Sequence, residues 1–278
     1  MPERKLVAIY NYWGNPKMLE LSIERMGPLV DGVLVIASTV SNYGEEELMP
    51  ASFERKYDII IFNPTNGDPR QKETDKRNRG LDEAIKRGYT HFLTCDEDEF
   101  YEPEEFRREW ARFENPDLLG LVCRVKCYFK SPTLTIGYDT TLVPFIHKLT
   151  PNLCHEFNRN YPFAWTKTNG TPFTQEKQIR IDPTRSLNIN SGVEWSDITM
   201  HHLSWVRSDI RKKIRNSTAR QNIERSTIVT DYVNAKEGYF CHFYGKVLQV
   251  TPNIFGLPEI NDTSIQSDFP PAGSTSTD

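Results

Sequence analysis

The fold of this chain is indicated by residues 89–101, which read Tyr-Thr-His-Phe-Leu-Thr-Cys-Asp-Glu-Asp-Glu-Phe-Tyr. The first half has the apolar character of a buried strand, and it runs directly into four consecutive acids. Because side chains alternate across a strand, we expect Asp96 and Asp98 to point together, with Glu97 and Glu99 on the opposite face. Four neighbouring carboxylates repel one another unless a positive charge lies among them. Two aligned carboxylates suit a hard divalent cation such as Mg²⁺ or Mn²⁺.

The sequence around this stretch alternates short apolar runs with helical patterns. Strands are predicted over 6–10, 32–37, 57–62 and 90–95, and helices over 16–27, 71–87 and 103–113. Nearly continuous apolar strands are typical of a parallel sheet that is covered on both faces. Ligands bind such sheets beyond the carboxyl ends of the strands, which is where the acids follow. The alternative is a solvated acidic turn that caps the helix after it.

The second half has a different pattern. Antiparallel strands are predicted over 118–130, 133–136 and 142–148, loops and short strands over 150–192, a helical pattern over 207–235 and a last strand over 246–257. The resulting fold class is α/β. We expect an α/β half over residues 1–115, a second half of the same domain over 116–261, and a flexible tail rich in Ser, Thr and Pro over 262–278.

Composition excludes several classes of protein. The chain has 278 residues, of which 37% are hydrophobic, so it can bury a full core. A net charge of −4 gives no general attraction to nucleic acid or to anionic membranes. No run approaches the roughly 20 apolar residues that cross a bilayer, so no membrane span is predicted. Five cysteines without paired spacing, and no apolar leader pattern, favour a reducing, cytoplasmic setting. The oligomeric state stays open.

The strand and helix order, the Asp96-Glu97-Asp98 motif and a later His-containing segment together resemble the nucleotide-sugar glycosyltransferases of the GT-A fold, a family-2-like group that includes small phage and environmental enzymes. The resemblance implies a Rossmann-like, mostly parallel central sheet flanked by helices, with a smaller antiparallel and loop-rich acceptor region. It assigns nucleotide-sugar binding to the first half, and acceptor binding and completion of the metal site to the second. The expected donor is a UDP-sugar.

The resemblance also implies a metal site that bridges the diphosphate of the donor. Asp98 is expected to bind the metal directly, and Asp96 through water or by contacting the sugar or ribose. The segment 199–207 would add His201 or His202, but not both, because neighbours on an extended strand point to opposite faces. We slightly prefer His201; a pair of structural histidines is the alternative. An imidazole ligand favours Mn²⁺ over Mg²⁺.

Donor contacts are expected at the edge of the sheet that carries the acids. Aromatic and amide side chains after the first strand suit stacking on a base or hydrogen bonding to it, although the aromatic rings could equally lie in the core. The helix before the acids resembles positions that meet the nucleotide or diphosphate, with a solvated helix face as the alternative. The candidates are Tyr10, Asn11, Tyr12, Lys72, Arg77 and Asn78.

An inverting transferase needs a carboxylate that accepts the proton of the acceptor hydroxyl, and Glu194 and Asp197 are the candidates. The basic segment 207–225 supplies Arg207 and Lys212 as candidate diphosphate contacts. The same segment could bind a phosphate-rich acceptor such as DNA, or it could be a solvated amphipathic helix. The acceptor is therefore a glycan hydroxyl or, as in some phage enzymes, a 5-hydroxymethylated pyrimidine in DNA.

Two other functions compete with this interpretation. A nucleotidyltransferase also uses paired carboxylates and a metal, but it usually has a glycine-rich phosphate loop after the first strand, and residues 11–16 match such a loop poorly. A non-catalytic glycan-binding module could use the acids to hold a stabilising cation. The donor sugar, the acceptor and the stereochemical outcome are not determined by the sequence.

Overall fold

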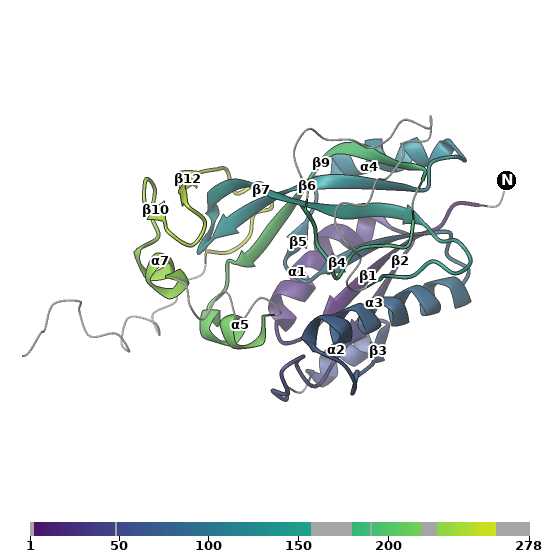
Figure 1. Cartoon of the computed structure of the whole chain (residues 1–278), viewed down its shortest axis with the longest axis horizontal. Helices are drawn as coiled ribbons and strands as arrows, with labels where there is room; N and C mark the ends of the chain where they lie inside the picture. The colour runs from purple at the N-terminus through teal and green to yellow at the C-terminus, as the bar shows by residue number, and fades with distance from the viewer. Residues whose placement is uncertain (1–2, 48, 157–179, 190, 218–226, 260–278) are drawn as a thin grey trace, which may run out of the picture. The chain divides into compact units, whose positions relative to one another are not determined.

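A computed structural model describes residues 3–47, 49–156, 180–189, 191–217 and 227–259. The expected tail over 262–278 and residues 157–179 of the expected loop region lie outside these residues. The α/β fold class is confirmed: a large, mostly parallel sheet is flanked by helices (Figure 1). By their internal contacts the residues form two units. The first comprises 1–126 and 138–202, and the second comprises 127–137 and 203–278.

Among the described residues the sheet has the strand order β3-β2-β1-β4-β7-β6-β9-β5. The parallel part consists of β1 (Leu6–Tyr12), β2 (Gly32–Ala37), β3 (Ile59–Ile61) and β4 (His91–Asp96). The same sheet also contains β5 (Glu99–Phe100), β6 (Gly120–Phe129), β7 (Ser131–Lys148), β8 (Arg180–Ile181) and β9 (Val193–Trp205). β7 runs antiparallel to β4, and β5 antiparallel to β9. All four parallel strands were predicted, whereas β9 lies between the predicted loop region 150–192 and the predicted helical pattern 207–235, where no strand was assigned.

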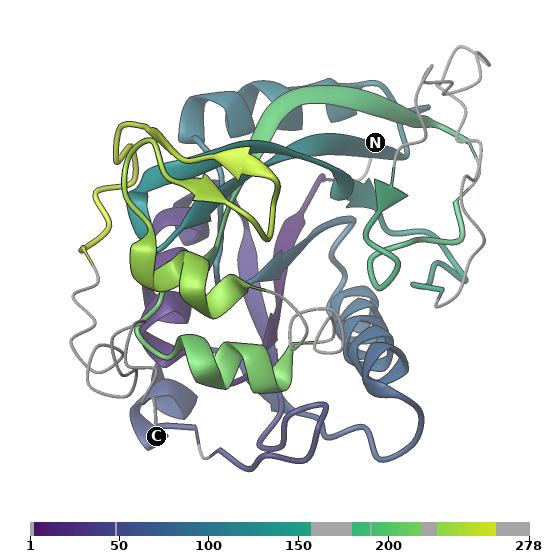
Figure 2. The ribbon, with the colours of Figure 1, turned by 60° about the vertical axis from the view of Figure 1, so that its left-hand side comes forward.

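The helices of the first unit are α1 (Pro16–Met26), α2 (Ala51–Lys56), α3 (Pro69–Lys86) and α4 (Pro103–Ala111). The Asp68 side chain accepts hydrogen bonds from the first backbone N–H groups of α3, so the sequence defines where this helix begins. Figure 2 shows α1 and α3 on opposite sides of the parallel strands. A Cβ on Gly80 would lie 2.4 Å from Cγ2 of Ile9, so α3 packs closely on β1 because residue 80 is glycine.

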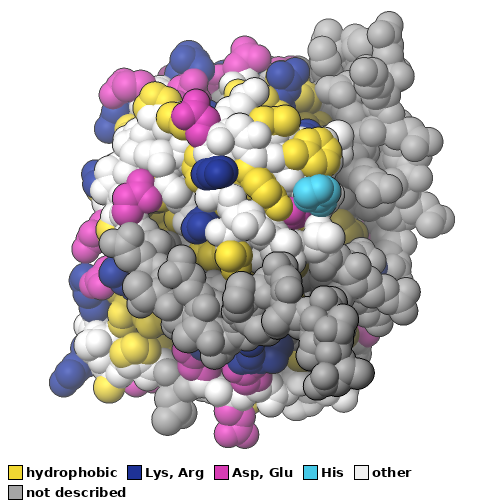
Figure 3. Space-filling view, turned by 90° about the vertical axis from the view of Figure 1, so that its left-hand side faces the viewer, with side chains coloured by type: hydrophobic (Ala, Val, Ile, Leu, Met, Phe, Trp, Pro, Cys, Tyr) yellow, Lys and Arg dark blue, Asp and Glu magenta, His cyan; other side chains and the backbone are white. Residues whose placement is uncertain are grey.

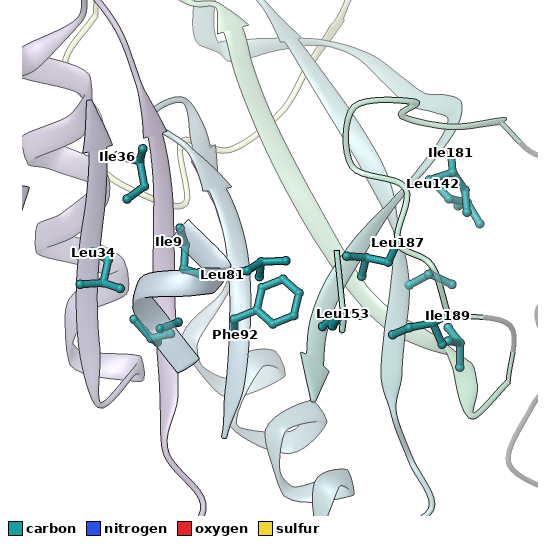
Figure 4. Packing of buried hydrophobic residues seen from close by; sticks show 14 residues of the cluster. Ile9, Leu34, Ile36, Leu81, Phe92, Leu142, Leu153, Ile181, Leu187 and Ile189 are labelled. Carbon is teal, nitrogen blue, oxygen red and sulfur yellow. The ribbon is translucent and has the colours of Figure 1, made fainter. Parts of the chain in front are cut away.

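The hydrophobic core of the first unit joins the parallel strands to later segments (Figure 4). Val7, Ile9, Leu34, Ile36 and Phe92 come from the parallel strands, and α3 adds Leu81 and Ala84. The later segments contribute Val122, Leu142, Leu153, Ile181, Leu187, Ile189 and Val193. The segment around residues 181–189, which carries no long strand or helix, is therefore anchored in this core.

The second unit contains α5 (Ile210–Asn216), α7 (Ile228–Asn234) and a small antiparallel pair, β10 (Phe240–Cys241) and β11 (Lys246–Val247). β12 (Gln249–Val250) pairs with the start of β7. The single helical pattern predicted over 207–235 is wrong in one respect, because Ser217 is extended after α5. No helix among the described residues is long and apolar enough to cross a membrane.

Candidate metal and donor site

The acidic motif lies in a turn rather than on a continuous strand. β4 ends at Asp96, Glu97 and Asp98 form the turn, and β5 begins at Glu99. The predicted alternation of the four acids is therefore wrong, since a turn does not alternate its side chains as a strand does. Asp96 and Asp98 have different surroundings as a result.

The pairing of β5 with β9 brings the motif to the later histidines. In the antiparallel register Glu99 lies opposite His202. The Nε2 atom of His202 is 3.5 Å from Oδ1 of Asp98. Asp98, Glu99 and His202 each offer one ligand atom, and these atoms all lie within 4.8 Å of one another. Carboxylate oxygens with one imidazole nitrogen fit a divalent cation, and they fit Mn²⁺ better than Mg²⁺.

Glu99 and Asp96 are engaged by arginines. Arg185 binds Glu99 through two hydrogen bonds, of which the one from Nη1 to Oε2 is 2.9 Å long. Oε2 of Glu99 also accepts a hydrogen bond of 3.1 Å from the backbone N–H of Asp96. The Asp96 carboxylate accepts from Nη2 of Arg185 at 2.6 Å and from Nη2 of Arg77 at 3.2 Å. Because both Glu99 oxygens are occupied, Asp98 and His202 are the better candidates for metal ligands.

Several charged residues near the motif were missed by the sequence interpretation. Arg185 lies within the region 150–192, which was predicted as loops and short strands, and its burial is a property of the fold. Glu73 on α3 accepts from Nη2 of Arg77 at 2.8 Å and from Oγ1 of Thr184 at 3.1 Å. Lys76 on the same helix is buried, and this burial lowers the pKa of its ammonium group although nearby acids oppose the shift. Buried cations of α3 and of the later segment thus balance the acids.

The residues after β1 take different positions. Tyr10 is fully buried, and its hydroxyl forms a 2.9 Å hydrogen bond with Oγ of Ser22 on α1, so it belongs to the core. Tyr12 is also buried, and burial together with the charge of Glu97 raises the pKa of its phenol. Asn11 is partly exposed and lies beside Asp96 in the pairing of β1 with β4. Of the three, Asn11 is the one that combines exposure with a position beside the acids.

The candidates on α3 are likewise divided. Lys72 is partly exposed on the first turns of the helix. Arg77 is buried against Glu73 and Asp96, as described above. The Asn78 amide accepts from the backbone N–H of His155 at 2.7 Å and donates to its carbonyl at 3.0 Å. Asn78 therefore holds a distant backbone segment in place, which commits both polar ends of its side chain.

Glu194, Asp197 and His201 lie on β9, but none of them joins the group formed by Asp98, Glu99 and His202. Glu194 precedes His202 by eight residues, which corresponds to about 26 Å along a strand. Its carboxylate binds Nη2 of Arg112 at 2.6 Å. Asp197 is exposed. His201 is buried, and its Nε2 is 3.9 Å from Oε1 of Glu102. The geometry favours His202 over the slightly preferred His201.

Arg207 and Lys212 belong to the second unit. Arg207 is buried, and its Nη2 donates to Oδ2 of Asp209 at 3.0 Å. The Tyr232 hydroxyl donates to the Arg207 carbonyl at 2.6 Å. Lys212 is partly exposed on α5. Part of the basic segment is therefore used in contacts within this unit, and residues 218–226 lie outside the described chain.

No family model and no curated protein matches this chain. Among solved structures, residues 1–349 of S. aureus TarS share 15% identity over 84% of this chain and 66% of that one, with a TM-score of 0.38. A protein described as mannose-1-phosphate geranyltransferase from Thermus thermophilus shares 17% identity over 47% and 44%, with a TM-score of 0.31. A glycosyltransferase involved in glycosylation of the major capsid of PBCV-1 shares 12% over 51% and 60%, with a TM-score of 0.27. This chain thus spans less than two thirds of the length of each of these three proteins. Because all three TM-scores are below 0.5, no residue role is transferred from these structures.

Proposed function

We propose that this chain is a metal-dependent glycosyltransferase that moves a sugar from a nucleotide-sugar to an acceptor hydroxyl. The observation that carries the proposal is the convergence of Asp98 and His202 at the carboxyl end of β4, where their ligand atoms approach within bonding range of one cation. Open α/β sheets bind their ligands at this edge. Buried carboxylates also need a nearby positive charge, which a divalent cation supplies in addition to the arginines.

In this proposal some residues of the chain hold the cation and others contact the nucleotide. Asp98 and His202 would hold a divalent cation, which supplies charge neutralisation for a departing diphosphate. Asn11 and Lys72 are the partly exposed candidates for contacts to the nucleotide. A UDP-sugar is the first donor to test.

The proposed acceptor is a glycan rather than DNA. On the face shown in Figure 3, Lys and Arg side chains of the described residues are interspersed with Asp and Glu. Buried Arg207 is paired with Asp209, which removes one cation from the basic segment. A DNA-binding surface is expected to be dominated by cations, because most of the affinity comes from phosphate contacts. The neutral hydroxyl groups of a glycan need no such surface.

The test is a calorimetric titration of UDP, GDP and CDP in the presence of Mn²⁺, Mg²⁺ or EDTA. Asp98→Asn should abolish metal-dependent nucleotide binding, whereas Glu97→Gln, which makes the same change of charge one residue earlier in the turn, should preserve it. A nucleotide present at 100 times its Kd adds about 2.7 kcal/mol of apparent stability, so thermal unfolding gives a second readout. Binding of Mn²⁺ without binding of any nucleotide would favour the glycan-binding module instead.

A further inference from the structure

We propose that Arg185 is a positioning residue, whose guanidinium bridges the two ends of the acidic turn and thereby holds Asp98 against His202. This inference rests on the proposed function, because it assigns a role in the same candidate metal site. Arg185 does not supply a metal ligand. It acts through the shape of the turn between β4 and β5, which carries Asp98.

The contacts of Arg185 span the turn from one side to the other. Asp96 is the last residue of β4, and its Oδ2 accepts from Nη2 of Arg185 at 2.6 Å. Glu99 is the first residue of β5, and it accepts from both terminal nitrogens of the same guanidinium. The backbone N–H of Asp96 closes the turn by donating to Oε2 of Glu99 at 3.1 Å. Asp98 lies between these two anchored residues.

Burial makes this bridge necessary. The side chains of Arg185 and Glu99 are 3% and 0% exposed. Without Arg185, Glu99 would be a buried carboxylate without a cationic partner, next to the further acids of the same motif. Mutual repulsion would then favour an opened turn. Opening of the turn moves Asp98 relative to His202, since His202 is fixed on β9.

The guanidinium is suited to this task in a way that an ammonium is not. Its planar fork donates several hydrogen bonds in fixed directions, so one group can hold two carboxylates at a set separation. The Arg185 side chain is itself oriented by its local turn, because its backbone N–H donates to the carbonyl of Asp182 at 3.0 Å and its Nε lies 3.6 Å from the Asp182 carboxylate. Lysine at position 185 keeps the charge but loses the fork.

The test is a titration with Mn²⁺ alone, in which electron paramagnetic resonance measures the free ion. Arg185→Lys should weaken Mn²⁺ affinity by about tenfold to a hundredfold, the range seen when residues that orient metal ligands are replaced. Raised Mn²⁺ should restore nucleotide binding. Arg112→Lys is the matched control: it changes an arginine that pairs with Glu109 and Glu194, and it should leave Mn²⁺ affinity within about twofold.

Asp96→Asn provides a second variant should Arg185→Lys fail to fold. It removes the charge from one end of the bridge, and a smaller loss of affinity is expected. A folded Arg185→Lys protein with wild-type Mn²⁺ affinity would overturn the positioning role and leave the proposed function intact. If the wild type itself binds no Mn²⁺, both proposals fail. Weakened Mn²⁺ binding in a protein that binds no nucleotide supports the role of Arg185 while rejecting the transferase.

Discussion

Arg112 donates from Nη2 to the carboxylate of Glu194 at 2.6 Å, and from Nη1 to the backbone carbonyl of Trp195 at 2.9 Å. Arg112 follows α4 directly, whereas Glu194 and Trp195 lie just after the first residue of β9, Val193. The ion pair therefore joins a helix end to a strand. This arrangement gives Glu194 a structural partner at the end of β9 that is distant from His202.

Glu194→Gln is accordingly expected to retain Mn²⁺ affinity and most sugar transfer. The lost ion pair should lower the free energy of unfolding by about 1 kcal/mol, because the pair is only partly buried. Steady-state kinetics and urea unfolding measure the two effects. A loss of turnover of a hundredfold or more, without a change in stability, would instead identify Glu194 as the catalytic base.

The two adjacent histidines should respond differently to substitution. His202→Ala is expected to weaken Mn²⁺ binding by at least about tenfold, because it removes a candidate ligand. His201→Ala should preserve Mn²⁺ affinity but destabilise the fold, since His201 is buried. Titration of Mn²⁺ and thermal unfolding of both variants provide the comparison. Equal losses of Mn²⁺ affinity would contradict the assignment.

Tyr10→Phe tests whether the first aromatic residue belongs to the core. The hydroxyl of Tyr10 bonds Ser22, whose own hydroxyl donates to the carbonyl of Glu99 at 3.1 Å. Removal of the phenolic oxygen should cost about 1 kcal/mol of unfolding free energy and leave nucleotide affinity unchanged. Chemical unfolding and calorimetry separate these readouts. Weaker nucleotide binding at unchanged stability would show that Tyr10 contacts the donor.

In the second unit, Asp231→Asn should be strongly destabilising. Asp231 is fully buried, and it accepts from the Phe243 backbone at 2.7 Å, the Tyr239 hydroxyl at 3.0 Å and Nδ1 of His242 at 3.0 Å. Although burial opposes ionisation, these donors lower the pKa of Asp231 to about 2.

An amide at position 231 presents a donor where the carboxylate accepts, so a loss of about 3 kcal/mol is expected. Urea unfolding checks it, and Thr227→Ala, which removes one donor at 3.1 Å, is the mild control. A loss below about 1 kcal/mol in Asp231→Asn would show that this network contributes little to stability.

Acid sensitivity should arise partly from His147. This residue is fully buried on β7, and burial lowers the pKa of its imidazole to about 3. In the unfolded chain the pKa of this imidazole is about 6.5. Between pH 6.5 and pH 3 the unfolded chain therefore binds more protons at His147 than the folded chain does, and the free energy of unfolding falls as the pH decreases through this range.

At pH 4.5 this effect of His147 lowers the free energy of unfolding by about 2–3 kcal/mol relative to neutral pH. His147→Phe should reduce the slope of unfolding free energy against pH between about 6.5 and 4.5. Urea unfolding at several pH values measures this slope. An unchanged slope would show that His147 does not contribute to it.

Much of the parallel sheet could be predicted because its strands are continuous apolar runs. The start of α1 at Pro16 was predicted correctly, whereas α3 begins at Pro69 and was predicted only from residue 71. β9 was not predicted over its full length because its pattern mixes polar side chains such as Ser196 and His202 with apolar ones. Only its pairing with β5 and β6 makes it a strand.

The acidic residues of the candidate site could be predicted from the sequence, whereas the arginine that pairs with them could not. The motif and the histidine pair have recognisable residue types and spacing. The selection of His202 depends on the register with Glu99, which is a long-range property. Arg185 lies 86 residues after Glu99, and no local pattern distinguishes it from a surface arginine. Sequence periodicity reports on burial, whereas ion pairing between distant segments depends on the tertiary fold.

The separation of Asp98, Arg185 and His202 along the chain has a consequence for biosynthesis. Translation proceeds at about 5–20 residues per second, so His202 is added roughly 5–20 s after Asp98. For most of that interval the nascent chain carries the acidic turn without Arg185, and for all of it without His202. Burial of Glu99 must therefore wait for Arg185, and the ability to capture a cation should appear only late in synthesis.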